Sequence, residues 1–140
     1  IFSKEVRPSI SDADWQRVHF LGHLPYQHFI PLLQISTVHV YLTYPFVLSW
    51  SLLEAMSAGC TIVASNTQPL HEAIVHNETG LLVDFFDHKA LAQSVCSLLN
   101  NPSERARLAK NARSFAQANY DLNQVCLPKQ LAWVENLASI

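Results

Sequence analysis

The sequence predicts an α/β fold in which a Rossmann-like parallel sheet is flanked by helices. Short apolar runs alternate with longer segments whose apolar residues recur every three or four positions, which is typical of strands separated by helices. A helical segment that ends at a glycine also leads directly into the apolar run 60–65. Because the 140 residues contain no repeat or dividing linker, we expect one domain covering 1–140.

Four short apolar runs are predicted to be strands. The first ends at Gly22, the third is too short and apolar to be anything but buried, and the fourth follows the turn 77–80. Residues 1–15 are polar and are expected to be irregular. The four predicted strands are 17–22, 38–42, 61–65 and 81–84.

Three helices are predicted in the first half of the chain. The segment 26–35 has helical spacing, and Pro31 within it predicts a kink or a late start. The segment 50–58 has Ser49 as a candidate N-cap and Gly59 as its stop. A short helix is expected over 69–75, with proline in its first turn.

The remainder is predicted to be helical. Asp87 is a natural N-cap for the segment 88–100. Asn101 and Pro102 then form a helix start, with a glutamate two residues further that can reach back to the cap. A C-terminal helix is expected over 123–140, although Pro128 interrupts its beginning.

Composition and charge argue against several classes of protein. The formal net charge of -2 does not suit a nucleic-acid-binding module, which needs a dense basic surface. No apolar run reaches the roughly 20 residues of a membrane-spanning helix. The cysteines Cys60, Cys96 and Cys126 are odd in number and widely spaced, so neither a disulfide framework nor a zinc site is expected. Cys60 and Cys96 lie in apolar contexts that predict burial.

Residues 43–54 are the candidate site, because ligands of parallel sheets bind beyond the carboxyl ends of the strands. The N–H groups of Val47, Leu48 and Ser49 lead into a helix whose N-terminus favours phosphate groups. Glu54 lies about one turn further on, and a carboxylate can accept two hydrogen bonds from a ribose diol. The alternative is a solvent-facing Glu54, but its apolar neighbours predict a largely buried helix in which an acid needs a partner.

The order of these motifs resembles that of group-1 (family 4-like) retaining GT-B glycosyltransferases. Glu54 begins Glu-Ala-Met-Ser-Ala-Gly, similar to the family pattern Glu-Ala-Met-Ala-x-Gly, and a short apolar strand follows in both. The segments 69–72 and 77–83 resemble the family's next helix start and its Gly-Leu-Leu-Val turn and strand. The similarity covers about 17–120, and it implies that Glu54 binds the ribose of a nucleotide-sugar donor.

The candidate donor-binding residues include departures from the family pattern. Phe46 replaces the acid that in the family reaches the donor sugar, and Val47 and Ser49 replace two glycines. We expect Tyr44 and Phe46 to form an apolar or stacking wall. His23 follows a predicted strand end, where it would lie beside the base or be a simple loop residue. The loop is similar to that of a bacterial subgroup of the family.

The resemblance implies that this chain is part of a C-terminal donor-binding domain, the incomplete C-terminal half of a GT-B fold. The implied enzyme transfers a sugar, without a metal or other cofactor, from a UDP- or GDP-sugar to a glycan or lipid-linked acceptor, as in polysaccharide biosynthesis. The N-terminal acceptor domain has no counterpart here, so we expect the chain alone to be inactive. No catalytic residue is identified. A non-catalytic nucleotide-sugar binding or assembly module and a GT-B-like epimerase remain alternatives.

Location and assembly follow from fewer observations. The cysteine usage favours a reducing, cytoplasmic compartment. A polar helix face carries a loose group of basic residues, Arg105, Arg107, Lys110 and Arg113. We expect these side chains to be solvated. The alternative is that they contact the inner membrane in the full-length protein. The last helix would expose Leu131, Val134 and Leu137, which favours self-association of the fragment.

Overall fold

The structure, a computed structural model, describes residues 7–44 and 47–138. Within these ranges three short strands form one parallel sheet in the order β1 (His39–Tyr41), β2 (Ile62–Ser65) and β3 (Leu81–Val83). The register places Val40 opposite Val63, and Ala64 opposite Leu82. The sheet confirms the predicted parallel arrangement, with strands one or two residues shorter than expected.

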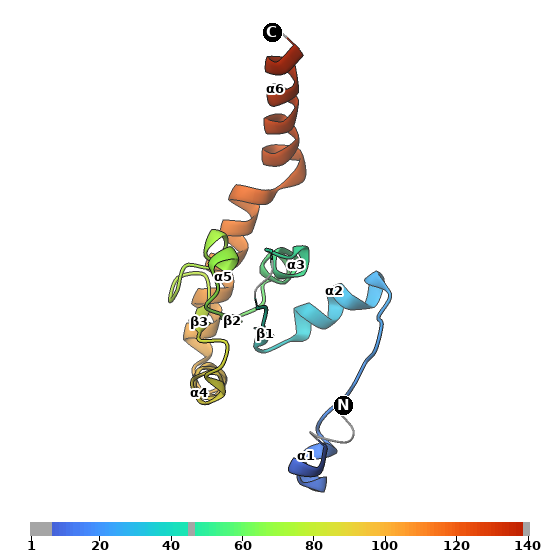
Figure 1. The fold of residues 1–140 in the computed structure, drawn as a ribbon, viewed down its shortest axis with the longest axis vertical. Coiled ribbons are helices and arrows are strands. Elements are labelled where there is room, and N and C mark those ends of the chain that lie inside the picture. Colours follow the sequence, from blue (N-terminus) through green and yellow to red (C-terminus); the bar gives the residue numbers. More distant parts are fainter. Residues whose placement is uncertain (1–6, 45–46, 139–140) are drawn as a thin grey trace.

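Helices cover both faces of the sheet, as Figure 1 shows. On one face, α2 (Tyr26–Ile35), α3 (Trp50–Ala58) and part of α5 (Pro102–Tyr120) pack on Ile62 and Ala64 of β2. On the other face, α4 (His88–Leu99) packs against Val63 and Val83. The alternation of β2 side chains therefore divides the core into two clusters, one on each face.

Helix α3 has the predicted bounds because both of its ends are fixed by local interactions. The Ser49 side chain accepts a hydrogen bond from the backbone N–H of Ser51, and Gly59 closes the helix in the left-handed region at φ 85°. The inner face buries Leu52, Ala55 and Met56. The helix therefore leads from the end of β1 into β2 with its apolar side on the sheet.

The predicted strand at 17–22 is wrong. Arg17 belongs to the turn after α1, residues 18–22 pair with no strand of the described chain, and Val18, Phe20 and Leu21 are exposed. Figure 1 shows the segment as a connection between α2 and α1 (Asp12–Trp15), away from the sheet. A strand needs a neighbouring backbone to hydrogen-bond with, and this segment has none here.

The N-terminal part is also less irregular than expected. Residues 7–9 form the short 3₁₀ turn η2 (Arg7–Ser9), and α1 begins after Ser11, whose side chain accepts from the N–H of Asp14. The side chain of Arg7 bonds to Asp12 and lies over the ring of Trp15. These local contacts hold α1 even though it is remote from the sheet.

The element after β2 differs from its prediction. Instead of a helix over 69–75, the chain forms the 3₁₀ helix η3 (Gln68–Glu72). The Thr79 hydroxyl accepts from the N–H of Val75 and donates to the carbonyl of Ala73. Thr79 thereby supplies backbone partners that a longer helix would have supplied, and the chain turns early toward β3.

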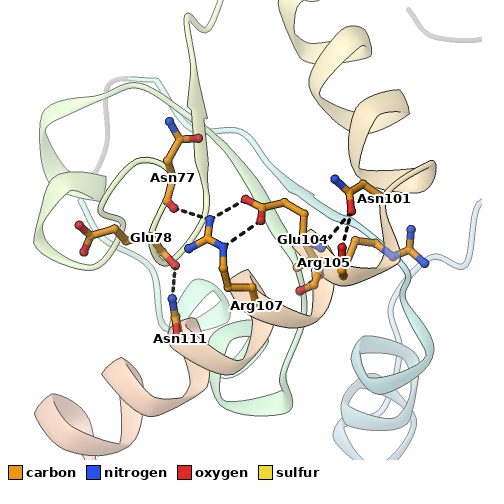
Figure 2. Close-up of polar contacts among 9 residues, drawn as sticks. Asn77, Glu78, Asn101, Glu104, Arg105, Arg107 and Asn111 are labelled. Atoms are coloured by element: carbon orange, nitrogen blue, oxygen red, sulfur yellow. Dashed lines mark hydrogen bonds and ion pairs between the residues drawn. The ribbon is translucent and has the colours of Figure 1, made fainter.

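The turn 77–80 is fastened to α5, as Figure 2 shows. Arg107 donates to the carbonyl of Asn77 at 2.7 Å, and Asn111 donates to that of Glu78 at 3.0 Å. Arg107 also binds both carboxylate oxygens of Glu104. Glu104 was expected to reach back to the helix cap, but its pairing with Arg107 draws the carboxylate along the helix instead.

The C-terminal part of the chain leads away from the core. The five-residue π-helix η4 (Leu122–Cys126) follows α5, and α6 (Leu127–Ala138) projects beyond the sheet in Figure 1. Pro128 does not break α6, because it lies in the first turn, where its missing N–H is not needed. Leu131, Val134 and Leu137 are exposed, as predicted. None of the described helices is long and apolar enough to cross a bilayer.

Burial was predicted for two of the three cysteine side chains. Cys60 is buried, as expected, and its thiol donates to the carbonyl of Leu33 at 3.0 Å. Burial raises the pKa of this thiol. Cys96 is exposed, so the prediction of burial is wrong: its apolar neighbours in sequence belong to the opposite face of α4.

Candidate functional site

The site is built where β1 and β2 end. The Ser65 hydroxyl, which is fully buried, accepts from the N–H of Thr43 at 3.0 Å and donates to the carbonyl of Thr43 at 2.8 Å. This two-way contact ties the exit of β1 to the end of β2. It fixes the point from which residues 43–49 lead into α3.

The start of α3 offers unused backbone donors. The N–H groups of Val47, Leu48 and Ser49 donate to no acceptor within the described chain. The Ser49 side chain satisfies the N–H of Ser51 at 3.3 Å and lies 2.9 Å from the Ser51 hydroxyl. The three donors precede the positive end of the helix dipole, which is the environment that attracts a phosphate group.

A large groove of about 770 Å³ lies on the outer side of α3. Helix α2, helix α3 and the chain from the end of α5 into α6 form its walls. Its lining is mostly apolar with a few polar groups, an arrangement common to small-molecule sites. The lining residues are Tyr26, Ile30, Gln34, Trp50, Leu53, Glu54, Ser57, Ala58, Tyr120, Leu122, Cys126 and Gln130.

Glu54 is half-buried in the wall of this large groove, so it is not a solvent-facing residue. A hydrogen bond to Glu54 is the main cause that raises the pKa of the Tyr26 phenol, with smaller contributions from burial and from the carboxylate charge. Tyr26 and Glu54 line the same groove, one from α2 and the other from α3.

A smaller groove of about 520 Å³ lies on the other side of the same loop, between residues 47–48 and η3. It is lined by Val47, Leu48, Gln68, Pro69, His71 and Glu72. The two grooves are close, because Leu48 lines this one and Trp50, two residues further along the chain, lines the other. Sequence reasoning did not select Gln68, His71 or Glu72, whose motif was interpreted only as a helix start.

Tyr44 lies in a separate aromatic cluster. Its ring centroid is 5.2 Å from that of Phe85 and 5.3 Å from that of Phe86. The predicted wall of Tyr44 and Phe46 cannot be described, because Phe46 lies outside the described residues. Phe85 and Phe86 follow β3, so the ends of two strands bring the three rings together at the same edge of the sheet.

His23 is exposed in the loop before α2, three residues from Tyr26, and it lines neither of the two grooves. No lysine or arginine of the part of the chain that the structure describes lines either groove. Within 7–44 and 47–138 there is no group of three or more His, Cys, Asp or Glu side chains arranged to hold a metal ion. The structure therefore places Val47 and Leu48 in one groove and Glu54 in the other, on either side of the α3 start that Ser49 caps, whereas Tyr44 and His23 line neither groove.

Comparisons with known proteins agree with this architecture. The family model described as glycosyl transferases group 1 matches residues 11–115. A glycogen synthase of Mycobacterium tuberculosis is 31% identical over 106 residues, which is 76% of this chain and 26% of the relative. This chain thus spans about a quarter of the length of that relative.

Solved structures show the same fold. A sucrose-phosphate synthase from Thermosynechococcus elongatus superposes with a TM-score of 0.82 at 24% identity, covering 98% of this chain and 35% of that structure. A structure of Anabaena HepE in complex with UDP-glucose has a TM-score of 0.81 at 25% identity, covering 99% of this chain and 37% of the other. The chain belongs to the group 1 glycosyltransferases, and its three-stranded parallel sheet with the flanking helices is part of the C-terminal domain of their GT-B fold.

Proposed function

We propose that this chain supplies the donor-binding half of a retaining, metal-independent glycosyltransferase that uses a UDP- or GDP-sugar. The observation that carries the proposal is Glu54, a half-buried acid in the wall of the 770 Å³ groove. In this proposal the nucleoside occupies the large groove and its ribose diol donates hydrogen bonds to the Glu54 carboxylate.

The diphosphate would lie over the start of α3. The N–H groups of Val47, Leu48 and Ser49 supply the favourable field there, a role that a metal ion has in other phosphate sites. Since no lysine or arginine among the described residues lines either groove, this contact depends on backbone donors and is weak. The chain alone is therefore expected to bind a donor without turning it over.

Two further observations support the proposal. The related HepE structures contain UDP, and UDP-glucose, which are ligands with the chemistry proposed for this groove. The three cysteines are free, which suits a reducing compartment, so we place the reaction in the cytoplasm. A glycan or lipid-linked acceptor, bound by a further domain, completes the proposed reaction.

The test is calorimetric titration of UDP, GDP, UDP-glucose and GDP-mannose into the chain and into Glu54→Gln. A hydrogen bond to a charged group contributes about 1.5–3 kcal/mol, so the substitution should weaken nucleotide binding at least about tenfold. Glu78→Gln is the matched control, because Glu78 is an exposed acid on the turn beyond β2 and lines neither groove. Absence of binding to the unmodified chain, or equal binding by Glu54→Gln, would contradict the proposed site.

A further inference from the structure

The smaller groove combines one apolar wall with one hydrogen-bonding wall. Val47, Leu48 and Pro69 are apolar, whereas Gln68, His71 and Glu72 project from η3. Its volume of about 520 Å³ falls within the range of about 300–1,000 Å³ that is common for small-molecule sites. A ligand bound here would need both an apolar face and several polar groups.

Glu72 has its full hydrogen-bonding capacity available. Its carboxylate makes no hydrogen bond and no ion pair with any residue in the described ranges, and none of the lysines and arginines in those ranges lines the groove. An unneutralised carboxylate repels phosphate but accepts hydrogen bonds from hydroxyl groups. The chemistry of this groove therefore selects a neutral, hydroxyl-bearing group over an anionic one.

His71 is held in place beside this acid. Its Nε2 lies 2.6 Å from the Oδ1 atom of Asn66, and because that oxygen only accepts, Nε2 carries the proton. The other ring nitrogen, Nδ1, makes no contact with the described residues and remains available to a ligand. A fixed imidazole next to a free carboxylate presents two different polar groups to adjacent hydroxyls.

The positions of the two grooves relate this chemistry to the proposed donor site. Residues 47–48 form one wall of the smaller groove, and Trp50 and Glu54, on the helix that follows, line the larger one. A molecule with its phosphates over the start of α3 therefore has one end at each groove.

We propose that Glu72, with His71 and Gln68, binds the hydroxyl groups of the donor sugar in the smaller groove. This inference rests on the proposed function, since it assigns the nucleoside end of the same donor to the larger groove. Glu72 then determines how much the sugar adds to the affinity of the nucleotide, and Glu54 determines the affinity of the nucleotide itself.

The experiment compares a nucleotide with its sugar conjugate. Calorimetry measures Kd for UDP and UDP-glucose, and for GDP and GDP-mannose, with the unmodified chain, Glu72→Gln and the control Glu78→Gln. For the pair that binds, Glu72→Gln should weaken the sugar conjugate about tenfold while changing the free nucleotide less than about twofold. Glu78→Gln should change neither value.

A second measurement separates direct contact from a structural effect. Saturation-transfer NMR on the bound sugar nucleotide reports which ligand protons lie against the protein. In Glu72→Gln the hexose ring protons should lose intensity relative to the ribose H1′ proton, whereas a general loosening of the site would reduce both. Thermal unfolding of the variant checks that the exposed substitution leaves the fold intact.

The results separate the two proposals. If neither nucleotide nor conjugate binds to the unmodified chain, the proposed donor site fails, and the sugar assignment fails with it. If nucleotides bind in a Glu54-dependent manner but Glu72→Gln changes both ligands equally or not at all, the donor site stands and the role of Glu72 is refuted. Equal affinity of the unmodified chain for nucleotide and conjugate would likewise refute it.

Discussion

The C-terminal end of α3 allows a stability prediction whose size follows from the structure. Gly59 has φ 85°, a left-handed conformation that costs an L-residue about 1–2 kcal/mol. No atom lies within 4 Å of a Cβ placed there, so a side chain would meet no steric obstacle. The backbone conformation alone therefore sets the cost of Gly59→Ala.

The expected change in unfolding free energy follows from two opposing effects. Alanine also restricts the unfolded chain, and this loss of unfolded-state entropy stabilises the folded protein by about 0.4–1 kcal/mol. After subtraction from the backbone cost, Gly59→Ala should lower the free energy of unfolding by about 1 kcal/mol. For a chain of this size, that corresponds to a lower melting temperature by about 3 °C. Gly59→Asn should cost less, because asparagine adopts the left-handed region more readily.

Urea unfolding followed by circular dichroism measures the three proteins under the same conditions. The order of stability should be Gly, then Asn, then Ala, with an unchanged dependence of the free energy on urea concentration. If alanine is as stable as glycine, or asparagine is less stable than alanine, backbone conformation does not control this helix end and the reasoning is refuted.

Two more predictions concern a titrating side chain and the turn contact. Burial lowers the pKa of His39 below its usual value of 6.5, because the folded state favours the neutral imidazole. The contribution of neutral His39 to the free energy of unfolding is therefore fully present above pH 6.5, and it is lost as the pH falls toward the lower pKa of the folded state. Urea unfolding at pH 5 and pH 7.5 should therefore show a smaller difference for His39→Gln than for the unmodified chain, while the exposed control His19→Gln should keep the full difference. Arg107→Ala should speed hydrogen exchange of the amides in 77–79, because the turn loses its bond to α5. Lys110→Ala, on the same helix, should leave that exchange unchanged, and equal rates in the two variants would contradict the role of Arg107.

Local signals explain which elements the sequence could predict. Helix α3 was predicted with its observed bounds because Ser49 and Gly59 act within one turn of the ends they define. The strands β1, β2 and β3 were placed within two residues because their apolar runs are short and bounded by turns. The 17–22 segment has a similar apolar composition but no paired neighbour, and pairing is a property of distant residues that composition does not contain.

In the candidate site, too, the local sequence predicted single residues but not the contacts between distant elements. Glu54 was selected from its own helix, but Tyr26, which lines the same groove, belongs to a different helix and was not predicted. The contact between Tyr44, Phe85 and Phe86 depends on two strand ends meeting at one edge of the sheet. Glu72 was not selected because only the folded chain places η3 opposite residues 47–48.

The link between the 77–80 turn and α5 has a consequence for the order in which the chain folds. It joins residues 30 and 33 positions apart in sequence, and β3 and α4 lie within the loop that it closes. Neither contact can form until that loop has closed, and its closure entropy is offset only when β3, α4 and α5 assemble together. These elements should therefore form in a single late step, after α3 and β2, and substitutions at Arg107 should speed unfolding more than they slow refolding.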